Sequence, residues 1–356
     1  MKKIFIVIII SIFFIPLGCI FTLKQKSHLW GVEEKYSFPQ ISLENIFDKT
    51  YQNQFEKWFQ QNFFLRNSMV KIRNQIYSWV NFNSFYCGYH NSIIRGKNSF
   101  LYERAYLSVR IPNQGLNETQ IELLKKIVQE CHSNEINIYF IIAPDKVSSY
   151  PEYLSPLYTY FYKNETNYAE QIKKTLQQNN IPVYNAQKLV FQLKEKNEYP
   201  PFNKTGTHWN LYGAGRTVQE SFNYFHIANI MLTNIETSKK AFLTERDISN
   251  LLNLSIHYKT NEDYCKPDFT TSTPLVTPTA IIGNSFSNEY KYILTTSHLL
   301  NEKTLQHYAN KPITDDDAKQ IWKSKNIFFI YTIIAFLNPD DQLYKKIQVL
   351  LDNKPN

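Results

Sequence analysis

From residue 93 onward, short apolar runs alternate with segments whose apolar residues recur at helical spacing. A helix is predicted to follow Asn117, because Asn117 and Gln120 form a capping pair ahead of apolar positions that share one face. An apolar strand over residues 136–143 comes next. The same patterns predict strands at 181–184, 279–283 and 326–334, and helices near 168–178, 186–196, 211–225 and after the last strand.

Strands that alternate with helices and are apolar throughout indicate an α/β fold with a mostly parallel sheet flanked by helices. Ahead of them, residues 93–102 place two apolar runs around a turn signal, as in a hairpin. Residues 54–80 carry aromatic and aliphatic side chains at helical spacing. They predict one or two amphipathic helices, packed on the main body or lying on a membrane surface. Residues 24–45 are expected to be an extended leader.

An uncharged run covers residues 4–23, directly after Lys2 and Lys3. As a helix it would be about 30 Å long, which fits a membrane span or an export signal. A cleaved signal and a retained anchor both stay open. We therefore expect a signal or membrane anchor at 1–23, a leader with amphipathic helices packed on the core at 24–92, and the main α/β domain at 93–356. That domain would lie on the periplasmic or extracellular face, anchored to the membrane or secreted.

The net charge of +8 comes from basic residues that are scattered among acidic ones, so a nucleic-acid partner is not expected. Outside the apolar run the cysteines are Cys87, Cys131 and Cys265, an odd number from which spacing selects no disulfide. No Cys-x-x-Cys or His-x-x-x-His pair occurs, so we expect no metal and no cofactor. Only 9 residues are glycine, and four of these, Gly206, Gly213, Gly215 and Gly283, fall in or directly after two short blocks described below.

Three segments follow or approach strand ends, where parallel sheets bind ligands. They are Pro144-Asp145-Lys146, Gly206-Thr207-His208-Trp209 and Gly283-Asn284-Ser285-Phe286-Ser287. Ser285, at a turn after a strand, is placed as a nucleophile would be, with its own backbone N–H available for an oxyanion. His208, ahead of a helix that Asn210 would cap, is the candidate base.

The order of these blocks resembles the SGNH-hydrolase-like polysaccharide O-acetyltransferases, typified by the alginate O-acetyltransferases of the bacterial periplasm. The matching segments, from about residue 50 to the last strand, are FEKWFQQNFFLRNSMVKIRNQI, RGKNSFLY, APDKVSSYPEYL, GTHWNLYGA and GNSFS. The resemblance implies a flavodoxin-like three-layer fold, with Ser285 as the acyl-accepting nucleophile and His208 as general base. It also implies a polysaccharide acceptor, and acetyl groups supplied through a membrane-bound acyltransferase.

One position departs from the family pattern. The family has Asp two residues before the histidine, and this chain has Gly206. Asp145, at a neighbouring strand end, is the first candidate to orient His208 instead; a backbone carbonyl is the second. The predicted function is extracytoplasmic O-acetylation of a cell-surface or secreted polysaccharide through acetyl-Ser285. The alternatives are a catalytically degenerate polysaccharide-binding or assembly component, or a carbohydrate acetyl esterase.

Overall fold

The structure is a computed structural model that describes residues 28–31, 35–80, 84–85, 93–108, 115–161, 168–196 and 198–355. The chain divides into two compact units, Met1–Ile94 with Ser249–Lys259, and Arg95–Ile248 with Thr260–Asn356. The apolar run 4–23 lies outside the described residues, so its predicted membrane role stays a prediction. In the described ranges, no helix has both the length and the apolar character needed to cross a bilayer.

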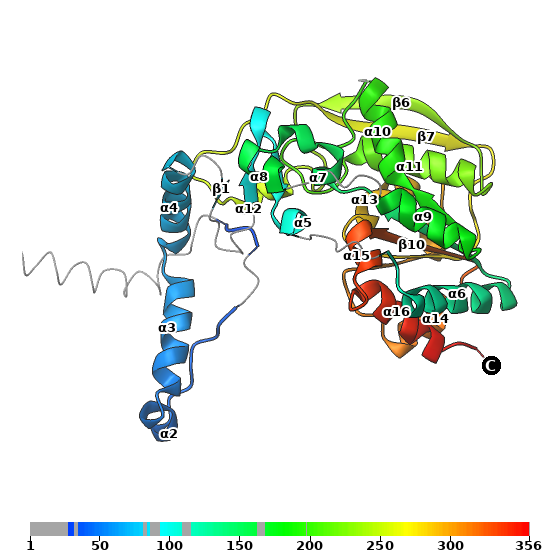
Figure 1. The fold of residues 1–356 in the computed structure, drawn as a ribbon. Coiled ribbons are helices and arrows are strands. Elements are labelled where there is room, and N and C mark those ends of the chain that lie inside the picture. The colour runs from blue at the N-terminus through cyan, green and yellow to red at the C-terminus, as the bar shows by residue number, and fades with distance from the viewer. Residues whose placement is uncertain are drawn as a thin grey trace, which may run out of the picture. The chain divides into compact units, whose positions relative to one another are not determined.

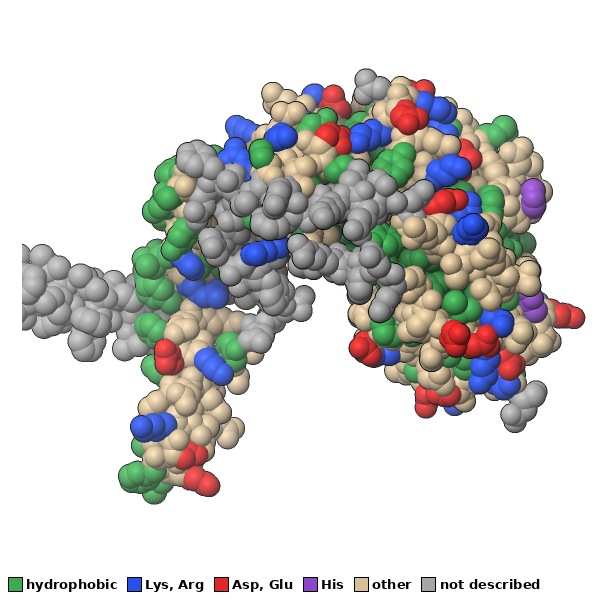
Figure 2. Space-filling view, viewed as in Figure 1, with side chains coloured by type: hydrophobic (Ala, Val, Ile, Leu, Met, Phe, Trp, Pro, Cys, Tyr) green, Lys and Arg blue, Asp and Glu red, His purple; other side chains and the backbone are tan. Residues whose placement is uncertain are grey.

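The described part of the first unit contains the helices α2 (Leu43–Phe47), α3 (Thr50–Asn62) and α4 (Arg66–Val80) and the short strand β1 (Ser84–Phe85). Two helices therefore cover the range 54–80, which confirms the predicted helical pattern there. Phe38, from the expected leader, packs edge-on against Phe55 and Trp58 of α3, with ring centroids 6.1 and 4.8 Å away. Hydrophobic side chains are prominent on the surface of α4 (Figure 2).

In the described part of the second unit, the main sheet has five strands in the order β5-β4-β10-β8-β9, and all neighbours are parallel. Every residue of β8 and β10 is buried, as the apolar runs predicted. The strands are β4 (Asn137–Ala143), β5 (Val183–Asn185), β8 (Thr279–Gly283), β9 (Leu305–Ala309) and β10 (Asn326–Thr332). The predicted α/β class is thereby confirmed, and the carboxyl ends of these strands share one edge.

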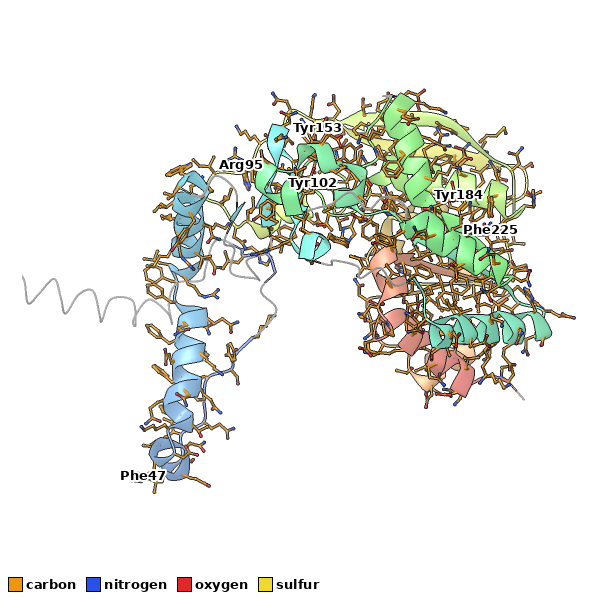
Figure 3. All side chains as sticks on the ribbon, in the orientation of Figure 1. Phe47, Arg95, Tyr102, Tyr153, Tyr184 and Phe225 are labelled. Carbon is orange, nitrogen blue, oxygen red and sulfur yellow. The ribbon has the colours of Figure 1, made fainter. Side chains whose placement is uncertain are left out.

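Helices cover both faces of this sheet (Figure 1). On one face, α6, α9, α14 and α16 join the strands in a continuous apolar core. On the other, Phe222 of α11 stacks on Phe328 and Tyr290 of α13 lies beside it, while Tyr139 contacts Phe225, which Figure 3 labels. The helices are α6 (Glu118–Ser133), α9 (Tyr168–Gln178), α10 (Ala186–Lys196), α11 (Leu211–Tyr224), α13 (Ser287–Thr296), α14 (Asp315–Ile321) and α16 (Gln342–Asp352). The capping box predicted at Asn117 and Gln120 is present at the start of α6.

Several elements were not predicted. An antiparallel pair, β6 (Ile230–Ser238) and β7 (Tyr264–Thr271), occupies a stretch that shows no clear pattern in the sequence. Strand β9 and helices α13 and α14 are also additions to the predicted order.

The remaining elements are short. They are β2 (Ile93–Arg95), η1 (Lys97–Ser99), β3 (Leu101–Glu103), α5 (Ala105–Ser108), α7 (Lys146–Ser149), η2 (Pro151–Tyr153), α8 (Pro156–Phe161), α12 (Asp247–Leu251), η3 (Glu302–Thr304) and α15 (Ile333–Leu337).

Candidate active site

Ser285 and His208 meet at the carboxyl edge of the sheet, although 77 positions separate them in the sequence. Ser285 follows β8, and His208 lies just ahead of α11, whose N-cap Asn210 accepts a hydrogen bond from the backbone of Gly213 at 2.9 Å. His208 Nε2 is 2.6 Å from Ser285 Oγ. The two residues predicted to act together are therefore in hydrogen-bonding contact.

The turn after β8 holds Ser285 tightly. A Cβ atom on Gly283 would come within 2.6 Å of the carbonyl oxygen of Ile330, so only glycine lets β8 run this close to β10. Asn284 then donates its backbone N–H to Ile330, and its side-chain oxygen accepts from the N–H of Phe286. Among the hydrogen bonds of the described residues, none uses the backbone N–H of Ser285, which is thus available to an oxyanion.

Trp209 ties the histidine loop to the serine loop. Its indole Nε1 donates to the carbonyl oxygen of Phe286 at 3.0 Å, and its side chain is almost completely buried. The Phe286 ring also contacts the His208 imidazole, with ring centroids 4.9 Å apart. Because this bond joins the residues next to His208 and Ser285, it fixes the distance between the base and the nucleophile.

A carboxylate that sequence reasoning missed lies on the far side of His208. Asp247 Oδ2 is 2.8 Å from His208 Nδ1, at ion-pair distance, although the two groups are not aligned as a good hydrogen bond. The other carboxylate oxygen accepts from the backbone N–H groups of Thr207 at 2.8 Å and Ile248 at 2.7 Å. Ser285, His208 and Asp247 thus form a continuous nucleophile, base and acid series.

Gly206 makes room for the segment that carries Asp247. A Cβ atom at this position would lie 2.8 Å from the carbonyl oxygen of Glu245, closer than Cβ atoms come to other atoms in real proteins. The Glu245 carboxylate accepts from the N–H of Leu211 at 3.1 Å and from the N–H of Phe242 at 2.9 Å. The missing side chain of Gly206 and the acid from residue 247 are therefore two parts of one arrangement.

A second anchor holds the same segment from the serine side. Thr244 donates its hydroxyl to the carboxylate of Glu289, a completely buried residue of α13. Burial raises the pKa of Glu289, and the nearby His208 and the Thr244 hydroxyl act in the opposite direction. Segment 242–247 is consequently fastened to both loops that carry the candidate catalytic residues.

The surroundings of His208 favour its protonated form. Burial of the ring alone would lower its pKa, but Asp247, with Glu289 and Glu103, outweighs burial and raises the pKa to about 9. Glu103 reaches the site through a 3.3 Å hydrogen bond from the Thr207 hydroxyl. In the neutral ring, a proton on Nδ1 facing Asp247 leaves Nε2 free to accept the proton of Ser285.

Asp145 does not orient His208, so the prediction that it replaces the missing acid is wrong. Its carboxylate caps α7, accepting from the backbone N–H of Ser148 at 2.7 Å and from the Ser148 hydroxyl at 2.6 Å. The adjacent Lys146 has a positioning role. Its buried ammonium donates to the carbonyl oxygens of Leu101, Lys204 and Gly206, each at 2.8 Å, and so supports the loop that leads to His208.

A second serine–histidine pair lies close by but differs in access. Ser287 Oγ is 2.9 Å from His307 Nε2, and it donates its one proton to the carbonyl oxygen of Asn284 at 2.7 Å. Burial, with Lys291 and Lys346, lowers the pKa of His307 to about 4. Ser287 is completely buried, whereas Ser285 is partly exposed. The Ser287 pair therefore braces the turn and does not face a substrate.

A pocket of about 330 Å³ opens next to the serine turn. Asn284 and Glu103 join it to the site, because one precedes Ser285 and the other contacts Thr207. Tyr106 lines it with a partly exposed side chain, Tyr331 is almost completely buried, and Asp341 contributes a second carboxylate. None of the described lining residues is Lys, Arg or His. Polar oxygens and amides beside aromatic rings suit a hydroxyl-rich ligand.

Other predicted chemistry can be placed briefly. Cys131 and Cys265 are buried free thiols, and Cys87 lies outside the described residues. In the ranges that the structure covers, no three His, Cys, Asp or Glu side chains gather as metal ligands.

A family model matches residues 93–247, and it describes the SGNH hydrolase-like domain of the acetyltransferase AlgX. The resemblance that the sequence blocks indicated is confirmed for this part of the chain. The matched range contains His208 and ends at Asp247, while Ser285 lies beyond it. No curated protein is significantly similar in sequence.

Several solved structures have a similar course of the chain. The O-acetyltransferase domain of Pseudomonas putida AlgJ is 16% identical, with a TM-score of 0.47 over 74% of this chain and 98% of that one. Pseudomonas aeruginosa AlgX is 15% identical, with a TM-score of 0.47 over 77% and 68%. Bacillus cereus PatB1, solved with a sulfonyl adduct, is 11% identical, with a TM-score of 0.44 over 71% and 96%.

Proposed function

We propose that the protein is an extracytoplasmic O-acetyltransferase that moves acetyl groups to hydroxyls of a cell-surface or secreted polysaccharide through acetyl-Ser285. The observation that carries this proposal is the continuous contact from Ser285 through His208 to Asp247. The family match over residues 93–247 supports acyl transfer as the reaction class. Asp247 also favours an active enzyme over a degenerate relative, since the acid missing at position 206 has a counterpart.

The first half-reaction loads the enzyme. His208 Nε2 takes the proton of Ser285 Oγ as that oxygen attacks the carbonyl carbon of an acetyl donor. The oxyanion that forms accepts a hydrogen bond from the backbone N–H of Ser285, and Asp247 stabilises the imidazolium. When the tetrahedral intermediate collapses, the bond to the donor breaks, His208 returns its proton to the leaving group, and Ser285 carries the acetyl ester.

The second half-reaction passes the acetyl group on. A sugar hydroxyl gives its proton to His208 Nε2 and attacks the acetyl carbon of acetyl-Ser285. Collapse of this second intermediate breaks the ester bond to Ser285 Oγ, which recovers its proton from His208. The products are an O-acetylated sugar and free enzyme, so no metal ion or redox cofactor is required by this sequence of steps.

The acceptor hydroxyl would come from a sugar unit in the pocket beside Asn284. Tyr106, which is partly exposed, offers a ring surface for a sugar, and the polar groups offer hydrogen bonds. Glu103 and Asp341 give this pocket a negative character without a basic side chain among its described lining residues. We therefore expect uncharged or amino-sugar acceptors to be preferred over uronic acid chains, whose carboxylates would be repelled.

The donor and the location complete the proposal. We expect a membrane-bound acyltransferase to supply the acetyl group, and residues 4–23 to hold the enzyme at the membrane. If water replaced the sugar in the second half-reaction, the same three residues would act as an acetyl esterase. Exclusion of water by a bound acceptor favours transfer.

The test is to supply the protein with an activated acetyl ester and an equimolar mixture of a neutral oligosaccharide and an oligouronate. Mass spectrometry of the sugars and release of acetate together measure transfer against hydrolysis. We expect acetylated neutral sugar in excess of free acetate, and no acetylated product with Ser285→Ala.

Two outcomes would contradict different parts of the proposal. Equal acetylation by wild type and Ser285→Ala would end the acetyl-serine mechanism. Release of acetate alone, dependent on Ser285, would assign the protein as an esterase.

For the pocket, Asp341→Asn is the suitable variant because Asn keeps the N-cap of α16. Asp341→Asn should lower the ratio of acetylated neutral sugar to acetylated oligouronate. Asp317→Asn, at the capping box of α14, should leave this ratio unchanged.

A further inference from the structure

Helix α4 has its polar and apolar sides reversed relative to an ordinary surface helix. Its buried residues are all polar, and each is no more than 8% exposed: Asn67, Asn74, Gln75 and Ser78. On the outside, a set of apolar side chains is between 43% and 61% exposed: Leu65, directly before the helix, and Met69, Ile72, Ile76 and Trp79. In a helix surrounded by water the apolar stripe faces the core. The outer side of α4 is therefore built for surroundings other than water.

Hydrogen bonds within the first unit fix this orientation. Asn74 donates its side-chain amide to the carbonyl oxygen of Leu252 at 3.0 Å, and Gln75 accepts from the backbone N–H of Ile256 at 3.0 Å. Rotating the apolar side inward would break both bonds and leave buried polar groups unpaired, which is unfavourable. The helix is thus held with its apolar residues outward.

The exposed residues form one continuous stripe. From Leu65 to Trp79 they recur at alternating intervals of four and three positions, which keeps them on a single side of the helix over about 20 Å. Soluble monomers seldom expose a contiguous apolar surface of this kind unless it binds something. Figure 2 shows hydrophobic side chains along α4, and α2 adds the exposed Phe47, which Figure 3 labels at its end.

The charged residues of α4 favour an anionic membrane as the partner of this stripe. Helix α4 contains three basic residues and no acidic one, in the sequence RNSMVKIRNQIYSWV. Arg66 and Arg73 lie at helical positions along one border of the apolar stripe, seven residues apart. Basic residues beside an apolar face with a tryptophan are the pattern of a helix that lies in the interface of an anionic membrane. A second copy packed on the same face would instead bring these arginines toward their counterparts.

We infer that α4 binds the surface of a lipid bilayer, with its apolar stripe in the acyl boundary and Arg66 and Arg73 at anionic headgroups. The uncharged run 4–23 in the same unit gives the chain a second apolar segment suited to a bilayer. Two membrane contacts are what stable attachment needs when one amphipathic helix alone binds reversibly. This inference concerns the first unit and does not depend on acetyl transfer.

The experiment uses the full chain reconstituted with vesicles, either of phosphatidylcholine alone or mixed with phosphatidylglycerol. A spin label is placed at Ile72→Cys on the stripe or, as the matched control, at Gln60→Cys on the exposed side of α3. The background carries Cys19→Ser and Cys87→Ser, and the buried Cys131 and Cys265 are left in place. Collisions with oxygen, which concentrates in lipid, are compared with collisions with a water-soluble nickel chelate.

We expect the oxygen-to-nickel collision ratio at position 72 to exceed that at position 60 several-fold in anionic vesicles. The difference should shrink with phosphatidylcholine alone and with Arg66→Gln/Arg73→Gln. Equal ratios at the two positions, or a chain that stays off the vesicles, would overturn the inference. Shielding of position 72 from both reagents alike would also overturn it, because protein and not lipid would then cover the stripe.

Discussion

Two segments meet at His208, and only one of them can be recognised from the sequence. Residues 206–209 form a compact block with glycine, histidine and tryptophan, and the histidine reaches Ser285 as the block suggests. Residues 242–247 carry no recognisable motif, yet they place Asp247 at ion-pair distance on the other ring nitrogen. The acid of a catalytic series therefore need not travel with the histidine, provided that the fold leaves space for it.

Space at Gly206 is what links the two segments. The glycine lets the backbone of Glu245 approach to a distance that any side chain would block. The lost acid and the close approach are complementary, since an Asp at position 206 would exclude the segment that now supplies one. If this is so, residues 242–247 should matter as much to the function of His208 as residues 206–209 do.

The largest effect is expected for Asp247→Asn. An amide oxygen still accepts from the backbone of Thr207, so the segment should stay in place, but the negative charge facing His208 is lost. By analogy with serine proteases, turnover should fall roughly 10⁴-fold. Steady-state hydrolysis or transfer of an activated acetyl ester measures this loss.

Asp145→Asn is the matched control for that variant. Asparagine also caps helices well, so α7 should remain and turnover should change less than about threefold. A similar loss in both variants would mean that general electrostatics or stability, and not the contact with His208, explains the effect of Asp247.

The next effect concerns pH. Only neutral His208 accepts a proton, and its pKa is raised to about 9, so kcat/KM should rise roughly fiftyfold between pH 7 and pH 9. In Asp247→Asn the midpoint should move to lower pH. A flat profile over this range would show that His208 is not the base.

The same raised pKa has a consequence for stability. Protonated His208 stabilises the folded state fully below its unfolded pKa of about 6.5, and this contribution is lost as the pH rises through about 9. Urea midpoints at pH 6 and pH 10, compared between wild type and His208→Gln, would measure that contribution separately from activity.

Gly206→Ala should have a smaller but clear effect. Its Cβ atom would press on the carbonyl oxygen of Glu245, and overpacking of this kind costs about 1–3 kcal/mol in the free energy of unfolding. Turnover should fall as Asp247 moves away. Gly115→Ala is the control, because a Cβ atom there meets nothing within 4 Å. Full activity in Gly206→Ala would show that the close approach at Gly206 is not needed to position Asp247.

Trp209→Phe should give the smallest change. The ring is largely kept, but the hydrogen bond to the carbonyl oxygen of Phe286 is lost, at about 1 kcal/mol. Urea unfolding measures the stability, and the rate of acetylation of Ser285 measures the alignment of the two loops. No change in either would show that this bond does not align them.

Much of the fold followed from local patterns. Strands β4, β8 and β10 are apolar throughout, and α6 has its capping box, so each is predicted by its own residues. Strand β9 was missed because its residues are only partly buried at the edge of the sheet. The β6–β7 pair was missed because its strands mix polar and apolar residues without a regular alternation in β6, so that pairing with the partner strand decides the structure.

The candidate site shows the same limit. Ser285 lies in a short block after β8, and His208 lies in a short block ahead of α11. Asp247 follows a long stretch without a pattern, and only the tertiary approach to Gly206 brings it to the histidine. On α4 the periodicity predicted the helix but not which side faces outward, because the hydrogen bonds to residues 252–256 decide that. Signals that depend on distant partners are absent from local sequence.

The most direct test of the central claim is to find which residue carries the acetyl group. The protein is quenched shortly after mixing with an activated acetyl ester, digested and mapped by mass spectrometry. The account predicts acetyl on Ser285, at near-stoichiometric level in wild type and strongly delayed in Asp247→Asn. Acetyl on Ser287, which lies in the same peptide as Ser285 and contacts His307, would contradict the account. Equal labelling rates in wild type and Asp247→Asn would also contradict it.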